Sequence, residues 1–305
     1  LHDSVRDLKD SCTSTDFAAL HLINGEHFAG AERVQQLLGK HLPECGVAAD
    51  FACIKPGKFV THCDLPPDTI FSVHMKRRAD WSVVSRVTNL AKSGQYEILH
   101  AHTPRTALIA TCVAARLDIP WIYHVHSPAA RDCSRPFVNR AKDWMERWSL
   151  QSCAKLITVS RSLRRELLQR GIARQRLVSV PNGVPSLPTL SINHRLQDSA
   201  WTLGMVALHR PRKGLEVLLH AFHRVLKEKA NVRLIVVGTF ETTDYERQIH
   251  SLVDHLGLQQ QVQFTGFTDN VPQYLLQMDA MVLPSLYGEG MPMVVLEALS
   301  AGVPV

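Results

Sequence analysis

The sequence has no long apolar run and few aromatic residues. Phe, Trp and Tyr make up 7% of the 305 residues, and no stretch approaches the roughly 20 uninterrupted apolar residues of a membrane-spanning helix. The first sixteen residues carry six charged side chains, which does not fit the apolar core of a signal peptide. We therefore expect a globular, cytoplasmic protein whose only membrane contact is peripheral.

Common cysteine and glycine motifs are also missing. The seven cysteines are scattered without a Cys-x-x-Cys pair, at positions 12, 45, 53, 63, 112, 133 and 153. This fits a reduced setting rather than a redox or zinc motif. No Gly-x-Gly-x-x-Gly follows the first strand of either half, and there is no Gly-Lys-Ser/Thr phosphate loop. These absences argue against nicotinamide dehydrogenases and nucleoside triphosphatases.

Charge is distributed unevenly along the chain. Residues 1–180 hold 25 Lys and Arg against 17 Asp and Glu, a net of +8, whereas residues 181–305 hold 9 against 11, a net of −2. A basic surface favours anionic partners, such as phosphate-bearing substrates or an anionic membrane surface. We expect no nucleic-acid partner, because 76–78 is the one dense basic run and no aromatic-rich binding motif accompanies it.

Short apolar runs alternate with amphipathic segments along the whole chain, which predicts an α/β fold with parallel strands joined by crossover helices. The length suggests two domains. In the first half, the sequence predicts strands at 17–23, 47–54, 97–102, 120–126, 155–160 and 177–180. Apolar residues at three- and four-residue spacing predict helices at 31–42, 81–92, 105–116, 137–154 and 161–170.

A stretch from Pro181 to about residue 200 is rich in turn formers and lacks periodicity, so it is interpreted as a linker. The expected domains are 1–184 and 185–305. In the second, the sequence predicts strands at 201–207, 232–238, 262–265 and 280–283, and helices at 214–229, 245–256, 270–277 and 292–301. The last residues, 302–305, look like the start of another strand, so we expect this domain to be incomplete at its C-terminus.

Ligands of open parallel sheets bind beyond the carboxyl ends of the strands, and two such places occur in the first half. The loop 24–30 contains Gly30 and leads into a helix, whose N-terminus attracts anions; an ordinary strand-to-helix turn is the alternative. Two strands end in His102 and His126, each suited to donate to a sugar hydroxyl or phosphate oxygen. With 16 histidines in the chain, a structural role is the alternative for each. No carboxylates stand at ligand spacing, so we expect no metal site.

Three cations follow the first strand of the second half, where a helix begins. They are Arg210, Arg212 and Lys213, and they suit a pyrophosphate, which carries adjacent negative charges. A solvated charge run is the alternative interpretation. The position directly after a first strand favours binding.

The segment 284–298 couples a strand end, a Gly-rich turn and a helix. Pro292 fits an early helix position, where its missing N–H costs nothing, and the turn before it aims free N–H groups at a ligand. Glu289 lies in the turn, whereas Glu297 lies in an apolar helical segment where a carboxylate needs a partner. Ligand hydroxyls are such partners, and an exposed helix stripe is the alternative. The candidate binding residues of this segment are Glu289, Gly290, Met291, Pro292, Met293 and Glu297.

Together these motifs resemble glycosyltransferase family 4. Glu289 and Glu297 stand at the family's Glu-x7-Glu spacing with Gly-Met-Pro between them, and 29–34, 157–160, 181–184 and 213–214 also match. The resemblance implies the GT-B architecture, in which two Rossmann-like domains with parallel sheets face a central cleft. It also implies a retaining hexosyltransferase of polysaccharide or glycoconjugate synthesis, with a nucleotide-diphosphate sugar as donor and a glycan or lipid-linked acceptor.

Residue roles follow from the same resemblance. Glu297 is expected to bind the donor ribose, Glu289 the transferred sugar, and the N–H groups of 290–293 its hydroxyls. Lys213 is expected to neutralise the diphosphate. From the first domain, Gly30 is expected to leave room for the diphosphate and His126 to contact the sugar. No cofactor or metal is expected, because these groups act by positioning and by charge stabilisation.

One family residue is displaced. An Arg usually stands several residues before the Lys, at about Ala207 or Leu208, and neither is Arg here. We expect Arg210 to replace it, because Arg212 adjoins the Lys and can point away. Three alternatives stay open: a sugar-nucleotide epimerase, a phosphorylase of the same fold, and a non-catalytic sugar-nucleotide-binding protein.

Overall fold

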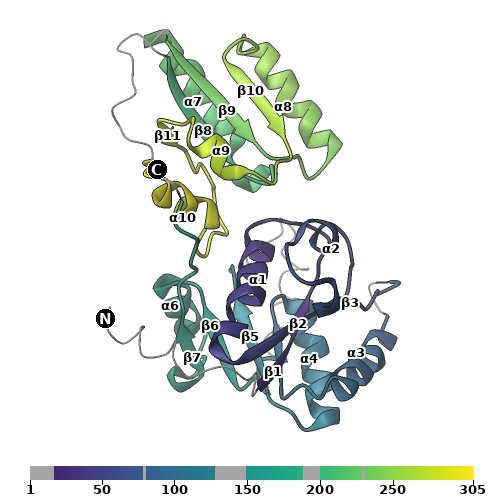
Figure 1. Ribbon diagram of the computed structural model, residues 1–305. Helices are drawn as coiled ribbons and strands as arrows, with labels where there is room; N and C mark the ends of the chain where they lie inside the picture. Colours follow the sequence, from purple (N-terminus) through teal and green to yellow (C-terminus); the bar gives the residue numbers. More distant parts are fainter. Residues whose placement is uncertain (1–16, 78–79, 128–148, 188–199, 229–230) are drawn as a thin grey trace. The chain divides into compact units, whose positions relative to one another are not determined.

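The computed structural model describes residues 17–77, 80–127, 149–187, 200–228 and 231–305. The chain divides into two compact units, Leu1–Asn182 and Gly183–Val305, called unit 1 and unit 2 below. Each unit is a parallel sheet with helices (Figure 1), which confirms the predicted α/β class. Within the described residues, no helix is long and apolar enough to cross a membrane.

Unit 1 contains a seven-stranded sheet in the order β3-β2-β1-β4-β5-β6-β7, and every recorded strand pair is parallel. The direction of the strand order reverses at β1, so β1 and β4 flank a topological switch point. The three-residue strand β3 was not predicted, because it is too short to show a periodic pattern. The strands are β1 Phe17–Ile23, β2 Val47–Cys53, β3 Ile70–Ser72, β4 Ile98–Ala101, β5 Trp121–Val125, β6 Lys155–Thr158 and β7 Leu177–Ser179.

Helices cover both faces of this sheet. Helix α4, Pro104–Leu117, begins one residue before the predicted start. Pro104 takes the first position, and the Thr103 side chain accepts a hydrogen bond from the N–H of Thr106 at 3.2 Å. The helix predicted at 137–154 lies almost wholly outside the described residues. Within the described residues, the other α-helices of unit 1 are α1 Gly30–His41, α2 Lys58–His62, α3 Ser82–Ser93 and α6 Arg161–Gln169.

Unit 2 contains a four-stranded parallel sheet in the order β10-β9-β8-β11, which places its switch point between β8 and β11. One buried cluster packs α7 and α8 on the sheet, and a second packs α9 and α10. The elements are β8 Trp201–Val206, α7 Leu215–Glu228, β9 Val232–Val237, α8 Thr243–His255, β10 Val262–Gly266, α9 Val271–Leu275, β11 Ala280–Met281 and α10 Met293–Ser300.

One prediction about unit 2 needs correction. Pro292 is not an early helix residue: it precedes α10 as the N-cap, with an extended ψ of 124°. The start of the predicted linker, 181–187, contains no helix or strand, and residues 188–199 of it lie outside the described residues. Two hydrogen bonds attach its start to α10. The hydroxyl of Ser300 in α10 accepts from the N–H of Leu187 at 3.0 Å and donates to the carbonyl of Pro185 at 3.0 Å.

Candidate active site

Two loops of unit 2 meet at its switch point. The first follows β8 and contains a short 3-10 helix, η6 (Pro211–Lys213). The second follows β11 and leads to α10. A backbone hydrogen bond from the N–H of Leu286 to the carbonyl of Arg212, at 2.9 Å, joins the two loops. Since β8 and β11 are neighbouring parallel strands, the sheet brings these two distant sequence segments together where ligands bind in such folds.

Gly214 allows this close approach. Its φ of +71° lies in the left-handed region, and a Cβ at this position would lie 2.2 Å from the carbonyl oxygen of Pro284. Any side chain would therefore push the loops apart. The glycine of the Lys213-Gly214 motif is thus required by packing, independently of any ligand.

Lys213 and Glu289 form an ion pair across the two loops, with Nζ and Oε1 2.5 Å apart. The hydroxyl of Ser285 donates to the same oxygen at 2.7 Å. Burial raises the pKa of Glu289, but the charge and hydrogen bond of Lys213 and the hydrogen bond of Ser285 together lower it below its usual value. Burial lowers the pKa of Lys213, and the charge and hydrogen bond of Glu289 raise it, with burial the larger effect. Glu289 is therefore held as a carboxylate.

The two arginines have different partners. Nη1 of Arg212 lies 3.4 Å from the carbonyl oxygens of Tyr287 and Gly288, so Arg212 reaches the second loop and does not point away. Arg210 instead pairs with Glu241, in the loop after β9, at 3.3 Å. Both arginines are close enough to Lys213 to lower its pKa. The three cations thus form one basic cluster at the switch point.

Glu297 lies in α10 and only 4% of it is exposed. Its helix neighbour Ala298 is fully buried, and Val294 and Val295 pack against the same apolar cluster. The structure therefore excludes the alternative that Glu297 occupies an exposed helix stripe. A buried carboxylate here needs hydrogen-bond donors.

Gly30 is the first residue of α1 in unit 1, one position before the predicted start. The carboxylate of Glu32 accepts from the N–H of Ala29 at 3.2 Å and so satisfies one free donor of the helix N-terminus. The preceding loop is fixed on the loop after β2 by the N–H of Lys55, which donates to the carbonyl of Asn24 at 2.8 Å. The loop that leads into α1 is therefore held by hydrogen bonds on both sides.

His126 lies just beyond β5, as predicted, and belongs to a cluster of five imidazoles. His21 and His100 are register partners across β1 and β4, and extending the register of β4 and β5 by one residue places His102 beside His124. Four of the five rings are buried. Burial lowers the pKa of His21 to about 3 and that of His124 to about 4, and it lowers the others well below 6.5; the five are His21, His100, His102, His124 and His126.

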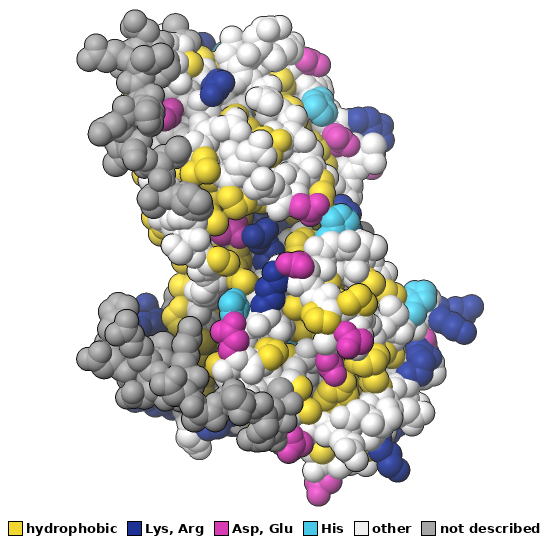
Figure 2. Space-filling view, viewed as in Figure 1, with side chains coloured by type: hydrophobic (Ala, Val, Ile, Leu, Met, Phe, Trp, Pro, Cys, Tyr) yellow, Lys and Arg dark blue, Asp and Glu magenta, His cyan; other side chains and the backbone are white. Residues whose placement is uncertain are grey.

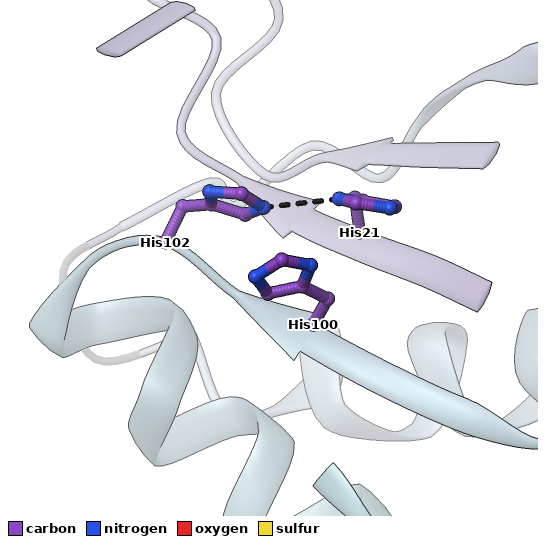
Figure 3. A group of neighbouring side chains, drawn as sticks. All are labelled: His21, His100 and His102. Carbon is purple, nitrogen blue, oxygen red and sulfur yellow. Dashed lines mark hydrogen bonds between the residues drawn. The ribbon is translucent and has the colours of Figure 1, made fainter. Parts of the chain in front are cut away.

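Hydrogen bonds connect three of these rings. Nδ1 of His21 lies 3.0 Å from Nε2 of His102 (Figure 3), and Nδ1 of His102 lies 3.0 Å from Nε2 of His126. His21 was not predicted as a site residue, because a single histidine inside an apolar strand gives no signal by itself. Ser285 and Glu241 were not predicted either, because their positions beside Lys213 and Arg210 depend on loop packing.

Two triads of the cluster have nitrogens close enough to be considered as metal ligands, namely His21, His100 and His102, and His102, His124 and His126, each with ligand atoms within 4.8 Å. Tetrahedral Zn²⁺, with bonds of about 2.0–2.1 Å, needs nitrogens about 3.4 Å apart. The rings of His100 and His102 are stacked, with centroids 4.3 Å apart and planes at 28°. A metal would require these rings to turn.

The arrangement of sheets and loops is that of a nucleotide-sugar-dependent glycosyltransferase of GT-B type. Comparison of the chain with known protein families supports this class. The family model described as "Glycosyltransferase Family 4" matches residues 28–186, and the model described as "Glycosyl transferases group 1" matches residues 189–305. The chain therefore belongs to glycosyltransferase family 4, whose members transfer a sugar from a nucleotide sugar.

Individual relatives are distant. The chain is 22% identical to the UDP-Gal:alpha-D-GlcNAc-diphosphoundecaprenol alpha-1,3-galactosyltransferase of Escherichia coli, over 90% of this chain and 75% of that protein. It is 27% identical to a phosphatidyl-myo-inositol mannosyltransferase of Mycobacterium leprae, over 73% of this chain and 58% of that protein. The crystal structure of Anabaena HepE in complex with UDP-glucose shares the fold, with a TM-score of 0.80 and 21% identity. The match covers 94% of this chain and 79% of the HepE chain.

Proposed function

We propose that this chain transfers a hexose from a UDP-sugar to a lipid-linked or glycan acceptor with retention of anomeric configuration. The observation that carries the proposal is the contact of Lys213 with Glu289 at the switch point of unit 2. It joins a cation suited to a diphosphate with a carboxylate suited to sugar hydroxyls. A UDP-sugar donor is supported by two similar proteins, the UDP-Gal-dependent transferase of Escherichia coli and Anabaena HepE in complex with UDP-glucose.

The donor has to compete for Lys213. A diphosphate carries adjacent negative charges, and we propose that it takes over Lys213 from Glu289, while Glu289 turns to the hydroxyls of the transferred sugar. The N–H groups of 290–293 and the buried Glu297 are proposed to bind the sugar and the ribose. Together these groups hold the donor and stabilise the departing diphosphate as its charge develops.

Unit 1 is proposed to contribute Gly30 and His126. Gly30 opens α1, where a small residue lets an anion approach the backbone. His126 lies just past the carboxyl end of β5 and is partly exposed, and it is proposed to contact an oxygen of the donor. These assignments follow the family motifs and make unit 1 the proposed acceptor-side domain.

The basic cluster of unit 2 is proposed to neutralise the diphosphate without a metal ion. Three cations, Arg210, Arg212 and Lys213, lie within electrostatic range of one another. We therefore expect transfer activity to persist in EDTA. A loss of activity that Mg²⁺ or Mn²⁺ restores would contradict this part of the proposal.

The decisive experiment is product analysis. The protein is incubated with a panel of UDP-sugars and a polyprenyl-diphosphate-linked sugar acceptor, and the products are identified by mass spectrometry and proton NMR. An α-linked product from an α-configured donor supports the proposal. An epimerised sugar nucleotide would support an epimerase instead. Sugar 1-phosphate released from a glycan in a parallel incubation with inorganic phosphate would support a phosphorylase, and no product in either incubation would support a binding protein. Glu289→Gln should abolish transfer, whereas Glu228→Gln, at an exposed position of α7, should not.

A peripheral membrane contact is proposed for reaching a lipid-linked acceptor. Residues 1–180 carry a net charge of +8, and a basic residue near an anionic surface contributes about 1 kcal/mol. On the face shown in Figure 2, Lys and Arg lie dispersed among Asp and Glu rather than in one patch. We therefore expect moderate, salt-sensitive flotation with anionic liposomes. Equal flotation with neutral liposomes would refute the electrostatic contact.

A further inference from the structure

The histidine cluster contains a continuous chain of hydrogen bonds that ends at His126. His21 comes from β1 and is fully buried, and His102 follows β4 and is 4% exposed. Figure 3 shows the rings of His21 and His102 side by side, with the bond between Nδ1 of His21 and Nε2 of His102. The second bond runs from Nδ1 of His102 to Nε2 of His126 at 3.0 Å. His102 therefore uses both of its ring nitrogens.

Each ring of this chain is neutral at physiological pH. Burial lowers the pKa of His21 to about 3, and it lowers those of His102 and His126 well below 6.5, with the neighbouring imidazoles adding to the effect. A neutral imidazole carries one N–H and one lone pair. Since His102 makes two bonds, it donates one and accepts the other.

Only two arrangements of protons satisfy both bonds. In the first, Nδ1–H of His21 donates to His102, and Nδ1–H of His102 donates to Nε2 of His126, so His126 carries its proton on Nδ1. In the second, every bond is reversed, so His126 carries its proton on Nε2 and His21 carries its own on Nε2. The two arrangements give His126 opposite hydrogen-bonding properties at Nδ1.

The buried end of the chain selects between them. Nε2 of His21 has no hydrogen-bond partner among the described residues. Neutral His124, whose two ring nitrogens have no partner among the described residues, already carries one N–H without an acceptor. The second arrangement would add another at His21, and each buried N–H without an acceptor costs free energy. The first leaves only a lone pair. The first arrangement is therefore favoured.

We propose that His102 is a positioning residue that holds His126 as the Nδ1–H tautomer, so that His126 offers a donor to an oxygen of the sugar nucleotide. This rests on the proposed function for the identity of the ligand. A donor at this nitrogen fits a phosphate oxygen or the lone pair of a sugar hydroxyl. It does not fit a general base, because Nδ1 then has no lone pair.

The tautomer is measured directly by two-bond proton–nitrogen correlation NMR of the full chain labelled with ¹⁵N-histidine. His126→Gln identifies the signals of His126. We expect the pattern of the Nδ1–H form in the free protein. The Nε2–H pattern would overturn the proposal, and so would a Zn²⁺ titration that shows tight stoichiometric binding at the His126 signals, because a metal-bound cluster would set the tautomers differently.

Two matched variants separate positioning from a general structural effect. His102→Leu removes the donor to His126, so we expect mixed tautomers and a fall in kcat/KM of about 3- to 10-fold, the size of one neutral hydrogen bond. His21→Leu leaves that donor in place and makes Nε2 of His102 the buried end of the chain, where a lone pair is again favoured over an N–H without an acceptor, so we expect the Nδ1–H form of His126. Equal effects of the two variants on the His126 signals would overturn the assignment.

The contact with the donor is tested by adding UDP and a UDP-sugar in separate NMR titrations of the same labelled protein. A shift of the His126 signals with UDP alone identifies a phosphate oxygen as the acceptor, whereas a shift only with the UDP-sugar identifies a sugar hydroxyl. If neither ligand shifts them, the contact with the donor is refuted although the tautomer assignment stands. Because the tautomer is read in the free protein, its failure is distinguishable from a failure of the proposed function.

Discussion

Lowering the pH from 7 to 5 is expected to destabilise unit 1 by about 4 kcal/mol through two buried histidines alone. His21 has a pKa of about 3 and His124 of about 4 in the folded protein, against about 6.5 when unfolded. Between these pH values the unfolded state binds more protons than the folded state. The contribution of the two rings to the free energy of unfolding is therefore fully present above pH 6.5 and is lost as the pH falls. Each residue costs about 1.36 kcal/mol per pH unit, hence about 2 kcal/mol at pH 5.

This loss is a large part of a typical folding free energy of about 5–15 kcal/mol. It is measured by urea unfolding at both pH values, with hydrogen exchange and mass spectrometry of the β1 and β4 peptides to follow unit 1 separately. His124→Phe removes one of these groups, so the loss between pH 7 and pH 5 should be about 2 kcal/mol smaller than in the parent protein. The exposed His74 provides the control: His74→Gln should leave the loss unchanged.

Two outcomes would refute this reasoning. The first is an unfolding free energy of unit 1 that is the same at pH 7 and pH 5. The second is an equal pH dependence in the parent protein and His124→Phe. Either result would mean that the rings are solvated or already protonated in the folded state.

Three further predictions concern unit 2. Gly214→Ala should lower the free energy of unfolding of unit 2 by about 3 kcal/mol, measured by calorimetry. Gly257 has a similar φ of +67° but open space around it, so Gly257→Ala should lower it by about 1 kcal/mol. Equal losses for the two variants would refute the contact between the loops. Glu297→Gln should weaken UDP binding about 10- to 100-fold in calorimetric titrations, and a change below about twofold would remove it from the nucleotide site. Arg210→Gln should weaken UDP binding more than Arg212→Gln, because a diphosphate can replace the carboxylate of Glu241 as the partner of Arg210, whereas Arg212 keeps its backbone carbonyls. The reverse order would assign the diphosphate to Arg212.

The elements and the motif positions could be predicted from local sequence. The alternation of apolar runs with amphipathic segments depends only on short-range periodicity, so it located the long strands and helices to within a few residues. Turn chemistry and strand ends likewise located Lys213, Glu289 and His126. The short strand β3 and the N-cap position of Pro292 were not predicted, because neither produces a repeating pattern.

The sequence by itself determined the α/β class, the family motifs and the chemical types of the candidate residues. Only the tertiary structure decided which of them touch. The pairing of Lys213 with Glu289 depends on β8 and β11 being neighbours, and the contact of His21 with His102 depends on β1 lying beside β4. Strand order is set by packing across the whole sheet, and burial in that sheet is what lowers the histidine pKa values. Neither property can be assigned from a segment considered alone.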